Sequence, residues 1–399
     1  MTRPDRRDPR TLGESSAAVH AGNAIDPTTG AIKTPLTLAN SYEFPHDPTA
    51  IDWGVNDQLL YTRTSGANQL ALQAKLAALE GAEAAAVFAS GVAAMHGVLF
   101  THLDAGDHVV CSDVVYEATF NLLTELLPRK HGITTTLVDI TDPAAVEAAI
   151  RPETRLVVAE TIANPTTTIA DLPVLAAIAH AHDALLVVDS TFSPPPMLRP
   201  LEHGVDLVVH SLTKYINGHG DALGGAVLGR TSLIDPIKQQ AMIDVGGVIA
   251  PFNAWLVQRG AVTLPLRLQQ MGRSAQRVAE FLDADSRVAW VRYPGLASHP
   301  QRELAERLLP RGCGGMLAFA PHGGTAEIND FVARLRLIIS ATSLGHDESL
   351  IAHFARSGPR QDRYGAPFTD EGTLRLSIGL EDAEDLIADL DAALGAAPD

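Results

Sequence analysis

The stretch "HSLTKYINGHGDALGG", residues 210–225, places Lys214 beside two hydroxyl side chains and just after an apolar run. A partly desolvated lysine can lose its proton and attack an aldehyde to form an imine. Ser211 and Thr213 lie two positions apart, so in an extended segment both hydroxyls point the same way and can donate to one phosphate. An isolated lysine is most often a solvated surface charge, so its role depends on what else lies near it.

Three further strand-like segments end in groups that could bind the same ligand as Lys214, Ser211 and Thr213. Ser90-Gly91-Val92 follows "AAAVFA" and opens a helical pattern whose free N–H groups would favour a phosphate. Asp189 ends the apolar run "LLVV", where an unpaired carboxylate would be costly, so we expect a cationic partner. Asn164 follows "RLVVAE". Taken singly, Ser90-Gly91 is better explained as a plain helix N-cap and Asn164 as part of a turn, whereas Asp189 is equally consistent with a structural cap.

The elements that must position these groups are typical of a layered α/β domain. Short apolar runs alternate with longer helical patterns, as expected when helices cover parallel strands. Ligands in such sheets bind at the carboxyl ends of the strands, where the four groups stand. Expected helices include residues 70–83, closed by Gly81, and residues 142–150, opened by Asp142. The expected strands are residues 84–90, 108–112, 134–140, 155–160, 184–190, 205–211 and 224–229.

The periodicity divides the chain into three parts. Residues 1–65 have little periodicity and many turn residues, so we expect an extended arm that contacts a neighbouring subunit. Residues 66–255 are expected to form the large α/β domain, and residues 256–399 a smaller α+β domain that begins with a helical stretch broken near Pro265. The elements expected in the smaller domain are strands 288–293, 316–320, 336–342 and 373–380 and a final helix 382–394.

The composition excludes several classes of protein. The net charge of -17, without a basic block beyond the first ten residues, argues against a nucleic-acid partner. No apolar run approaches the roughly 18 residues needed to span a bilayer, so we expect no membrane partner and a cytoplasmic protein. Cys111 and Cys313 lack the paired spacing of a zinc site, so neither a metal nor a disulfide is expected.

The four groups together meet the needs of one cofactor, pyridoxal phosphate. It requires a lysine for its aldehyde, a carboxylate for its ring nitrogen, and hydroxyls with a helix N-terminus for its phosphate. A nicotinamide-dependent dehydrogenase would share the alternating strands and helices, but the chain has no G-x-G-x-x-G between a first strand and its helix.

A series of motifs extends along nearly the whole chain: "AVHAGNAIDPTTGAIKTPL", "LAALEGAEAAAVFASGVAA", "VVDSTFSPPP", "HSLTKYINGHGDALGG" and "LRLSIGLE". In these motifs the chain resembles the Cys/Met-metabolism family of pyridoxal-phosphate enzymes, which includes cystathionine γ-synthase, cystathionine and methionine γ-lyases and O-acylhomoserine sulfhydrylases. The resemblance implies the aspartate-aminotransferase-like fold of fold-type I, with a mostly parallel seven-stranded sheet. It also implies a homo-oligomer, expected to be a tetramer built as a dimer of active dimers.

The resemblance implies a role for each matching residue. Lys214 looks like the Schiff-base lysine that also moves protons, Asp189 like the partner of the pyridine nitrogen, and Tyr116 like the tyrosine that stacks on the ring. Tyr61 is similar to a tyrosine that the arm supplies to the neighbouring subunit's site for acid/base work. Arg375, with Ser343 nearby, would clamp the substrate carboxylate. The further cofactor contacts that the resemblance implies are Ser90, Gly91, Val92, Asn164, Ser211, Thr213 and Arg63, the last from the arm to the phosphate.

The resemblance implies γ-elimination, or γ-replacement, on a homoserine-, cystathionine- or methionine-type L-amino acid, with a 2-oxo acid and ammonia released on elimination. A transferase of the cystathionine γ-synthase or sulfhydrylase type, and a cofactor-binding protein without activity, stay open as alternatives. His219 in "INGHGD" is interpreted as a structural histidine, because Lys214 already supplies a base.

Segments that depart from the family pattern predict an unusual substrate or acceptor. The usual "YSRYGNPT" is here "YTRTSGANQ", and the usual "HPASMTH" is "HFARSGP", which contains Arg356. Ala118 stands where methionine γ-lyases have cysteine. Our hypothesis is that Arg356, His346 or Glu117 recognises the substrate.

Overall fold

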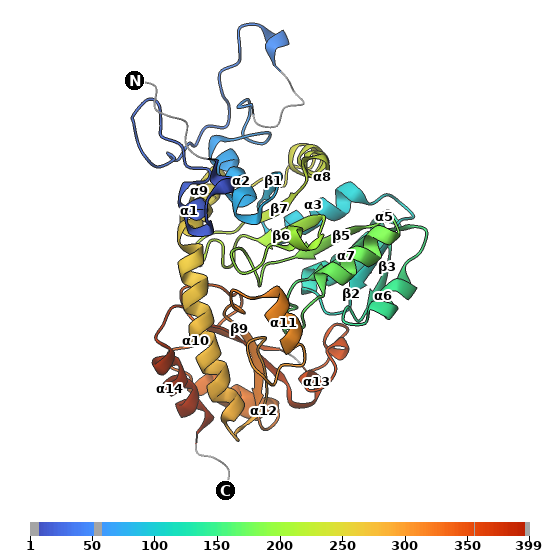
Figure 1. Cartoon of the computed structure of the whole chain (residues 1–399), viewed down its shortest axis with the longest axis vertical. Coiled ribbons are helices and arrows are strands. Elements are labelled where there is room, and N and C mark those ends of the chain that lie inside the picture. The colour runs from blue at the N-terminus through green and yellow to red at the C-terminus, as the bar shows by residue number, and fades with distance from the viewer. Residues whose placement is uncertain (1–7, 52–57, 355, 396–399) are drawn as a thin grey trace.

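The computed structural model describes residues 8–51, 58–354 and 356–395. These residues form a seven-stranded sheet with strands between residues 84 and 229, and a five-stranded sheet with strands between residues 288 and 377 (Figure 1). The large and the smaller sheet confirm the predicted fold class. The exact domain boundaries at residues 65 and 255 stay predictions.

The large sheet has the strand order β1-β7-β6-β5-β4-β2-β3. Strands β2 to β6 pair in parallel, whereas β7 is antiparallel to both of its neighbours, so the sheet is mostly parallel as predicted. Each strand coincides with one of the apolar runs in the sequence. The strands are β1 (Ala84–Phe88), β2 (His108–Ser112), β3 (Thr134–Val138), β4 (Thr154–Glu160), β5 (Leu185–Asp189), β6 (Leu207–Ser211) and β7 (Gly225–Gly229).

Helices cover both faces of this sheet. Val188 and Val208 lie in one buried cluster with residues of α2 (Ala67–Glu80) and α7 (Leu172–Ala181). Val187 and Val209, one position away, lie in the other cluster with residues of α3 (Gly91–His102). Side chains alternate between the two faces of a strand, so continuous apolar runs are needed to bury both.

The helix ends follow the signals in the sequence. Helix α2 ends at Gly81, whose φ of 75° is the left-handed conformation that glycine adopts readily. The Asp142 carboxylate accepts the N–H groups of Ala144 and Ala145 at the start of α6 (Pro143–Ala149). Pro265 stands in the first turn of α10 (Leu264–Ala284), after a 3₁₀ turn separates it from α9 (Pro251–Gly260), so the expected break is confirmed.

The smaller sheet has the order β10-β11-β12-β9-β8. The predicted strand over 336–342 is wrong in extent, since only Ile339–Ser340 pairs, as the edge strand β10, and β11 was not predicted. Strand β11 pairs with β12 along its whole length, and this non-local pairing places it inside the sheet while β10 stays at the edge. The longer strands are β8 (Val288–Arg292), β9 (Met316–Pro321), β11 (Leu350–Phe354) and β12 (Thr373–Ser377).

Helices α10 and α14 (Ala383–Leu394) pack together beside the smaller sheet, and their apolar residues share one buried cluster with its strands (Figure 1). The final helix is therefore where the sequence predicts it. The other helices are α1 (Glu14–His20), α4 (Glu117–Asn121), α5 (Leu127–His131), α8 (Thr231–Ile237), α11 (Arg302–Leu308), α12 (Thr325–Arg334) and α13 (Phe368–Glu371), with π-helical segments Leu122–Leu126 and Lys238–Asp244.

The N-terminal segment combines one packed helix with exposed loops. Helix α1 contributes Ala17 and Ala18 to the core against α2. Beyond it the chain extends away from the sheets (Figure 1), and Ile32 and Leu38 are 68% and 72% exposed. Large apolar side chains that are exposed together often mark an interaction site, which favours the predicted contact with a neighbouring subunit.

Cys111 and Cys313 are free thiols, the first buried and the second half-buried. Among the residues that the structure describes, no helix has the length and apolar character to span a bilayer. The same residues contain no group of three or more histidine, cysteine, aspartate or glutamate side chains placed to hold a metal ion.

Candidate active site

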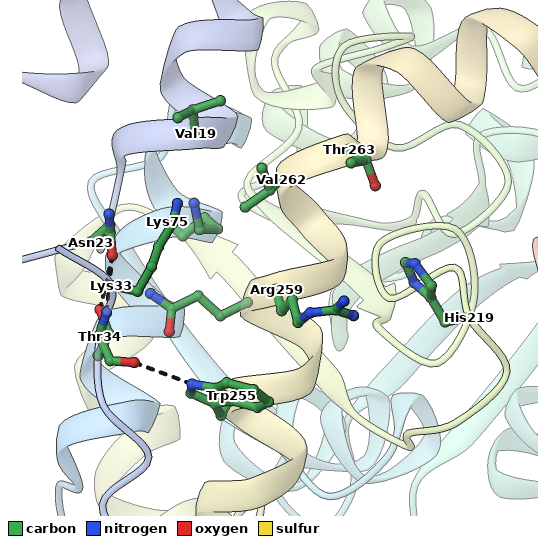
Figure 2. Close-up of a pocket in the computed structure, with 11 residues that line it drawn as sticks. Val19, Asn23, Lys33, Thr34, Lys75, His219, Trp255, Arg259, Val262 and Thr263 are labelled. Carbon is green, nitrogen blue, oxygen red and sulfur yellow. Dashed lines mark hydrogen bonds between the residues drawn. The ribbon is translucent and has the colours of Figure 1, made fainter. Parts of the chain in front are cut away.

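A cavity of about 410 Å³ lies between the arm and α9. Lys33, Thr34, Lys75 and Trp255 are among the residues that line it (Figure 2). The Trp255 indole N–H donates to the Thr34 carbonyl over 3.1 Å, and the Lys75 ammonium donates to the Ala18 carbonyl. None of the predicted cofactor or substrate residues lines this cavity. Its contacts hold the arm against the large domain.

The predicted residues gather around a different cavity, of about 430 Å³, at the carboxyl ends of β4, β5 and β6. Residues 342–344 and 352–354, together with Arg360 and Arg375, supply further lining from the C-terminal part of the chain. The strand ends converge here because parallel strands end at one edge of the sheet. The predicted residues that line the cavity are Ser90, Gly91, Val92, Tyr116, Asn164, Asp189, Ser211, Thr213, Lys214, Ser343 and Arg375.

Lys214 extends from the turn after β6 into this cavity. Its Nζ donates to the Ser343 hydroxyl over 2.7 Å. Burial, helped by the positive charge of Arg375, lowers the pKa of Lys214 to about 8. The neutral amine, which is the nucleophile toward an aldehyde, is therefore far more populated near neutral pH than it is for an ordinary lysine.

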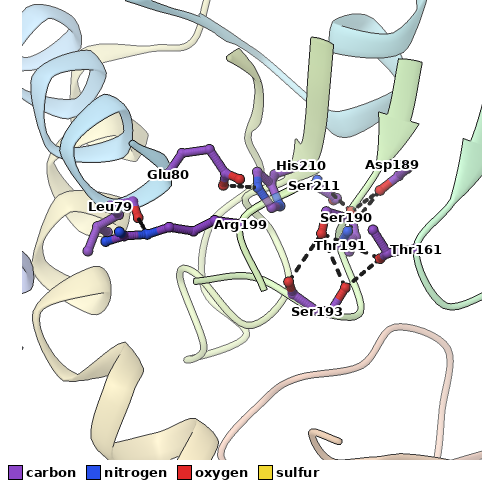
Figure 3. Close-up of polar contacts among 10 residues, drawn as sticks. All are labelled: Leu79, Glu80, Thr161, Asp189, Ser190, Thr191, Ser193, Arg199, His210 and Ser211. Atoms are coloured by element: carbon purple, nitrogen blue, oxygen red, sulfur yellow. Dashed lines mark hydrogen bonds and ion pairs between the residues drawn. The ribbon is translucent and has the colours of Figure 1, made fainter. Parts of the chain in front are cut away.

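Asp189 is held by hydrogen bonds but has no cationic partner in the described part of the chain. Its Oδ1 accepts the Thr191 backbone N–H over 2.9 Å and the Thr191 hydroxyl over 2.6 Å (Figure 3). The Ser211 N–H in turn donates to the Thr191 hydroxyl oxygen over 2.8 Å, which fixes that hydroxyl between β5 and β6. Burial raises the pKa of the Asp189 carboxyl against the opposing effect of its hydrogen bonds to Thr191, and a cationic group of a ligand would further favour the ionised form.

The N-terminus of α3 and the turn after β6 form a narrow cradle. The Ser90 hydroxyl oxygen accepts the Ala93 N–H over 3.1 Å, so Ser90 is the N-cap of this helix. A Cβ on Gly91 would lie 2.7 Å from Cβ of Ser211, and one on Gly225 would lie 2.0 Å from the Ser90 carbonyl oxygen. Only glycine permits this approach, which brings the free N–H groups of the helix within reach of an anion.

Thr213 is already engaged with the backbone of the cradle. Its hydroxyl donates to the Gly224 carbonyl over 3.3 Å and accepts the Gly224 N–H over 3.1 Å. These bonds connect the start of the Lys214 turn to the residue before β7. The predicted phosphate contact of Thr213 therefore competes with a structural contact, and it stays a prediction.

Arg375 presents one buried donor that nothing in the described chain accepts. Its two terminal nitrogens donate to the Asn164 side-chain oxygen over 2.9 Å and to the Ser343 carbonyl over 2.7 Å. Its Nε is buried without a partner. Burial lowers the pKa of Arg375 to about 10, and an anionic ligand would offset that cost.

Glu160 and Arg360 line the same cavity and were missed in the sequence. The Glu160 carboxylate accepts the backbone N–H groups of Tyr116 and Asn164, and burial with the nearby Asp189 charge raises its pKa to about 8. Arg360 donates to the carbonyls of Val115 and Asn164. Glu160 could have been predicted as a site residue, because it ends β4 directly beside Asp189 at the end of the neighbouring strand β5. Arg360 lies in an irregular segment that carries no such signal.

The three residues proposed to recognise the substrate lie in different places. Arg356 does not line the cavity and donates instead to the Thr369 carbonyl over 3.3 Å. His346 reaches the cavity only through Ser343, 3.1 Å from its hydroxyl. Glu117 lines the cavity directly.

Tyr61 and Arg63 do not line the cavity of their own chain. Tyr61 is 42% exposed, the Arg63 guanidinium lies 5.6 Å from the centre of its ring, and Arg63 donates to the Ile243 carbonyl. Their predicted role in the neighbouring subunit's site stays a prediction. His219 shares a hydrogen bond of 2.7 Å with the Asn217 carbonyl, in keeping with a structural histidine.

The donors and acceptors of this cavity fit pyridoxal phosphate. Lys214 suits its aldehyde, and the carboxylate of Asp189 needs the kind of cation that a protonated ring nitrogen supplies. The glycine-lined N-terminus of α3 suits its phosphate. The fold and the site together define a pyridoxal-phosphate enzyme of fold-type I.

Comparison with known proteins gives the family. The sequence model of the Cys/Met metabolism PLP-dependent enzymes matches residues 15–395, and the chain belongs to this family. It is 56% identical over 394 residues to a canavanine gamma-lyase of Pseudomonas canavaninivorans, covering 98% of each chain. It is 41% identical over 395 residues to an L-methionine gamma-lyase of Porphyromonas gingivalis, covering 96% of this chain and 98% of the other.

A solved structure confirms the fold. The crystal structure of metB from Corynebacterium glutamicum matches 97% of this chain and 99% of its own with a TM-score of 0.89, at 35% identity. The protein is therefore a pyridoxal-phosphate-dependent lyase or transferase that acts by γ-elimination or γ-replacement on an amino acid. The alternative of an inactive cofactor-binding protein is set aside.

Proposed function

We propose that the protein is a γ-lyase for canavanine-type amino acids, in which a guanidinooxy group on the γ carbon is the leaving group. The supporting observation is the identity of 56% to a canavanine gamma-lyase, against 41% to a methionine gamma-lyase over a similar length. The altered segments near the cavity agree with a substrate other than methionine. A synthase or sulfhydrylase activity is less favoured.

In this proposal the steps of the reaction are divided among the residues of the cavity and the cofactor. The cofactor, when bound, supplies the electron sink that makes the hydrogens of the substrate acidic. Arg375 holds the substrate carboxylate with its free Nε, and Lys214 takes up the α proton. Asp189 keeps a positive charge on the ring nitrogen, and Tyr61 of the partner subunit or Lys214 donates a proton to the departing oxygen.

The overall reaction breaks the bond between the γ carbon and the oxygen. Canavanine and one water give hydroxyguanidine, 2-oxobutanoate and ammonia. If water instead replaces the leaving group at the γ carbon, the products are hydroxyguanidine and homoserine. Both equations balance without an oxidant or reductant.

The test is a substrate panel with product analysis. Purified protein saturated with pyridoxal phosphate is incubated with canavanine, methionine, cystathionine or O-acetylhomoserine, and products are identified by mass spectrometry. We expect hydroxyguanidine from canavanine with a kcat/KM at least about tenfold above that for each other substrate. A preference for methionine or O-acetylhomoserine would contradict the proposal.

We also propose that the protein works in the cytoplasm as a tetramer built as a dimer of active dimers, with each arm completing the site of its neighbour. The exposed apolar residues of the arm and the distance of Tyr61 and Arg63 from their own chain's cavity support this arrangement.

Mixing two inactive variants tests the shared site. A dimer of one Lys214→Ala chain and one Tyr61→Phe,Arg63→Ala chain contains one site in which both defects fall together and one site that is intact. We therefore expect refolded equimolar mixtures to regain about a quarter of the wild-type activity, given random pairing. No recovery in mixtures shown to contain mixed dimers would place Tyr61 and Arg63 in their own chain's site.

A further inference from the structure

Three carboxylates line the active-site cavity within the described residues: Glu117, Glu160 and Asp189. Two of them are committed to other contacts. Glu160 accepts two backbone N–H groups, and Asp189 is held by Thr191 and suits the ring nitrogen of the cofactor. The Glu117 carboxylate has no hydrogen bond or ion pair with any described residue.

Glu117 lines the cavity next to the residue that is predicted to cover the cofactor. It is the first residue of α4 and follows Tyr116, which is predicted to cover the cofactor ring. Its side chain is exposed, so its carboxylate is accessible to an entering ligand. Burial raises the pKa of the nearby Tyr364 to about 12, and the charge of Glu117 adds a smaller contribution in the same direction.

A cationic substituent would otherwise meet positive charges in this cavity. Lys214, Arg360 and Arg375 line it, and both arginines are more than nine-tenths buried. Like charges in a partly desolvated site repel strongly, so a guanidinooxy cation needs a nearby anion. A thioether or acyl ester at the same place carries no charge and needs none.

We propose that Glu117 recognises the cationic end of the substrate, with its carboxylate accepting two N–H groups of the guanidinooxy group, and thereby selects cationic over neutral γ substituents. This inference rests on the proposed function. Carboxylate and guanidinium groups pair through two parallel hydrogen bonds, which gives direction as well as attraction. Of Arg356, His346 and Glu117, which the sequence suggested for substrate recognition, Glu117 is the one that lines the cavity.

Binding of two unreactive amino acids tests the role without turnover. L-Arginine resembles canavanine in shape, carries a permanent guanidinium charge, and has a methylene in place of the oxygen bonded to the γ carbon; L-norleucine is a neutral analogue. Both are titrated into cofactor-loaded wild-type protein and Glu117→Gln, with the change in cofactor absorbance as the signal. We expect the variant to bind arginine about 10- to 100-fold more weakly and norleucine within about threefold of wild type.

Two further variants serve as controls. Glu125→Gln removes the same charge from the π-helical segment after α4, outside the cavity, and is expected to bind both ligands as wild type does. Glu117→Asp keeps the charge and is expected to recover part of the arginine affinity. An unchanged melting temperature and cofactor spectrum in Glu117→Gln show that the fold is intact.

The outcomes separate the inference from the proposed function. If Glu117→Gln binds arginine and norleucine equally more weakly, or binds both as wild type does, the role of Glu117 is overturned even where wild type consumes canavanine. Selective loss of arginine binding supports it. If wild type consumes no canavanine but shows that selective loss, the proposed function fails and Glu117 still selects cationic amino acids.

Discussion

Lys214→Ala is expected to lose the visible absorbance band of lysine-bound cofactor and at least about 10³-fold in kcat. The variant has no amine at the cavity to bond the aldehyde, and no group to take up the α proton of the substrate. Added alkylamines can replace the proton carrier only in part. The measurements are an absorbance spectrum after reconstitution with pyridoxal phosphate, and steady-state release of hydroxyguanidine.

Lys75 provides a matched control. It is also a buried lysine, and burial with the nearby charge of Lys33 lowers its pKa to about 8, yet it lines the other cavity (Figure 2). Lys75→Met is expected to keep the absorbance band. After borohydride reduction of the wild type, peptide mass mapping should find the cofactor on Lys214. A band that survives in Lys214→Ala but disappears in Lys75→Met would refute the assignment.

The large sheet was predictable because its strands bury both faces. Such strands are continuous apolar runs between turn residues, and each run of this kind became one strand from β1 to β7. The covering helices were predictable from their end signals, such as Gly81 after α2 and Asp142 before α6. These features are local, so a single sequence contains them.

The smaller sheet shows where local patterns fail. Residues 336–342 and Leu350–Phe354 are both partly apolar, but only the second pairs with β12 along its length. Ile339 of the edge strand stays 49% exposed. The choice depends on pairing with residues far along the chain, which periodicity does not encode.

The site was predictable to the extent that it is built from strand ends. Asp189, Asn164 and Lys214 follow neighbouring strands and meet at one edge of the sheet. Arg360 enters from an irregular segment near the C-terminus, where nothing local fixes its direction. Tyr61 and Arg63 lie outside the cavity of their own chain, and the proposal that they act in a neighbouring subunit's site concerns contacts between two chains.

Asp189→Asn is expected to lower kcat/KM about 10²- to 10³-fold, or about 3–4 kcal/mol of transition-state stabilisation. Asparagine keeps the size of the side chain and can still accept from Thr191, but it carries no negative charge to stabilise a proton on the ring nitrogen. Without that proton the ring withdraws electrons less strongly. Kinetics with canavanine and a pH titration of the cofactor absorbance measure both effects.

Thr191→Val separates the charge of Asp189 from its orientation. This variant removes the hydroxyl that donates to Asp189 over 2.6 Å and leaves the backbone N–H bond of 2.9 Å. We expect a loss of only about tenfold, because one hydrogen bond disappears while the charge remains. If Asp189→Asn loses no more than Thr191→Val, orientation rather than charge is the contribution of Asp189.

A cofactor analogue methylated on the ring nitrogen gives the decisive comparison. Its ring nitrogen carries a permanent positive charge, so in Asp189→Asn the ring stays positively charged without the missing carboxylate. We expect it to raise the activity of that variant and to leave Lys214→Ala inactive, since no ring charge replaces an absent amine. Failure to raise Asp189→Asn, with the analogue shown to be bound, would mean that the buried carboxylate serves the fold of β5 and β6 rather than the chemistry.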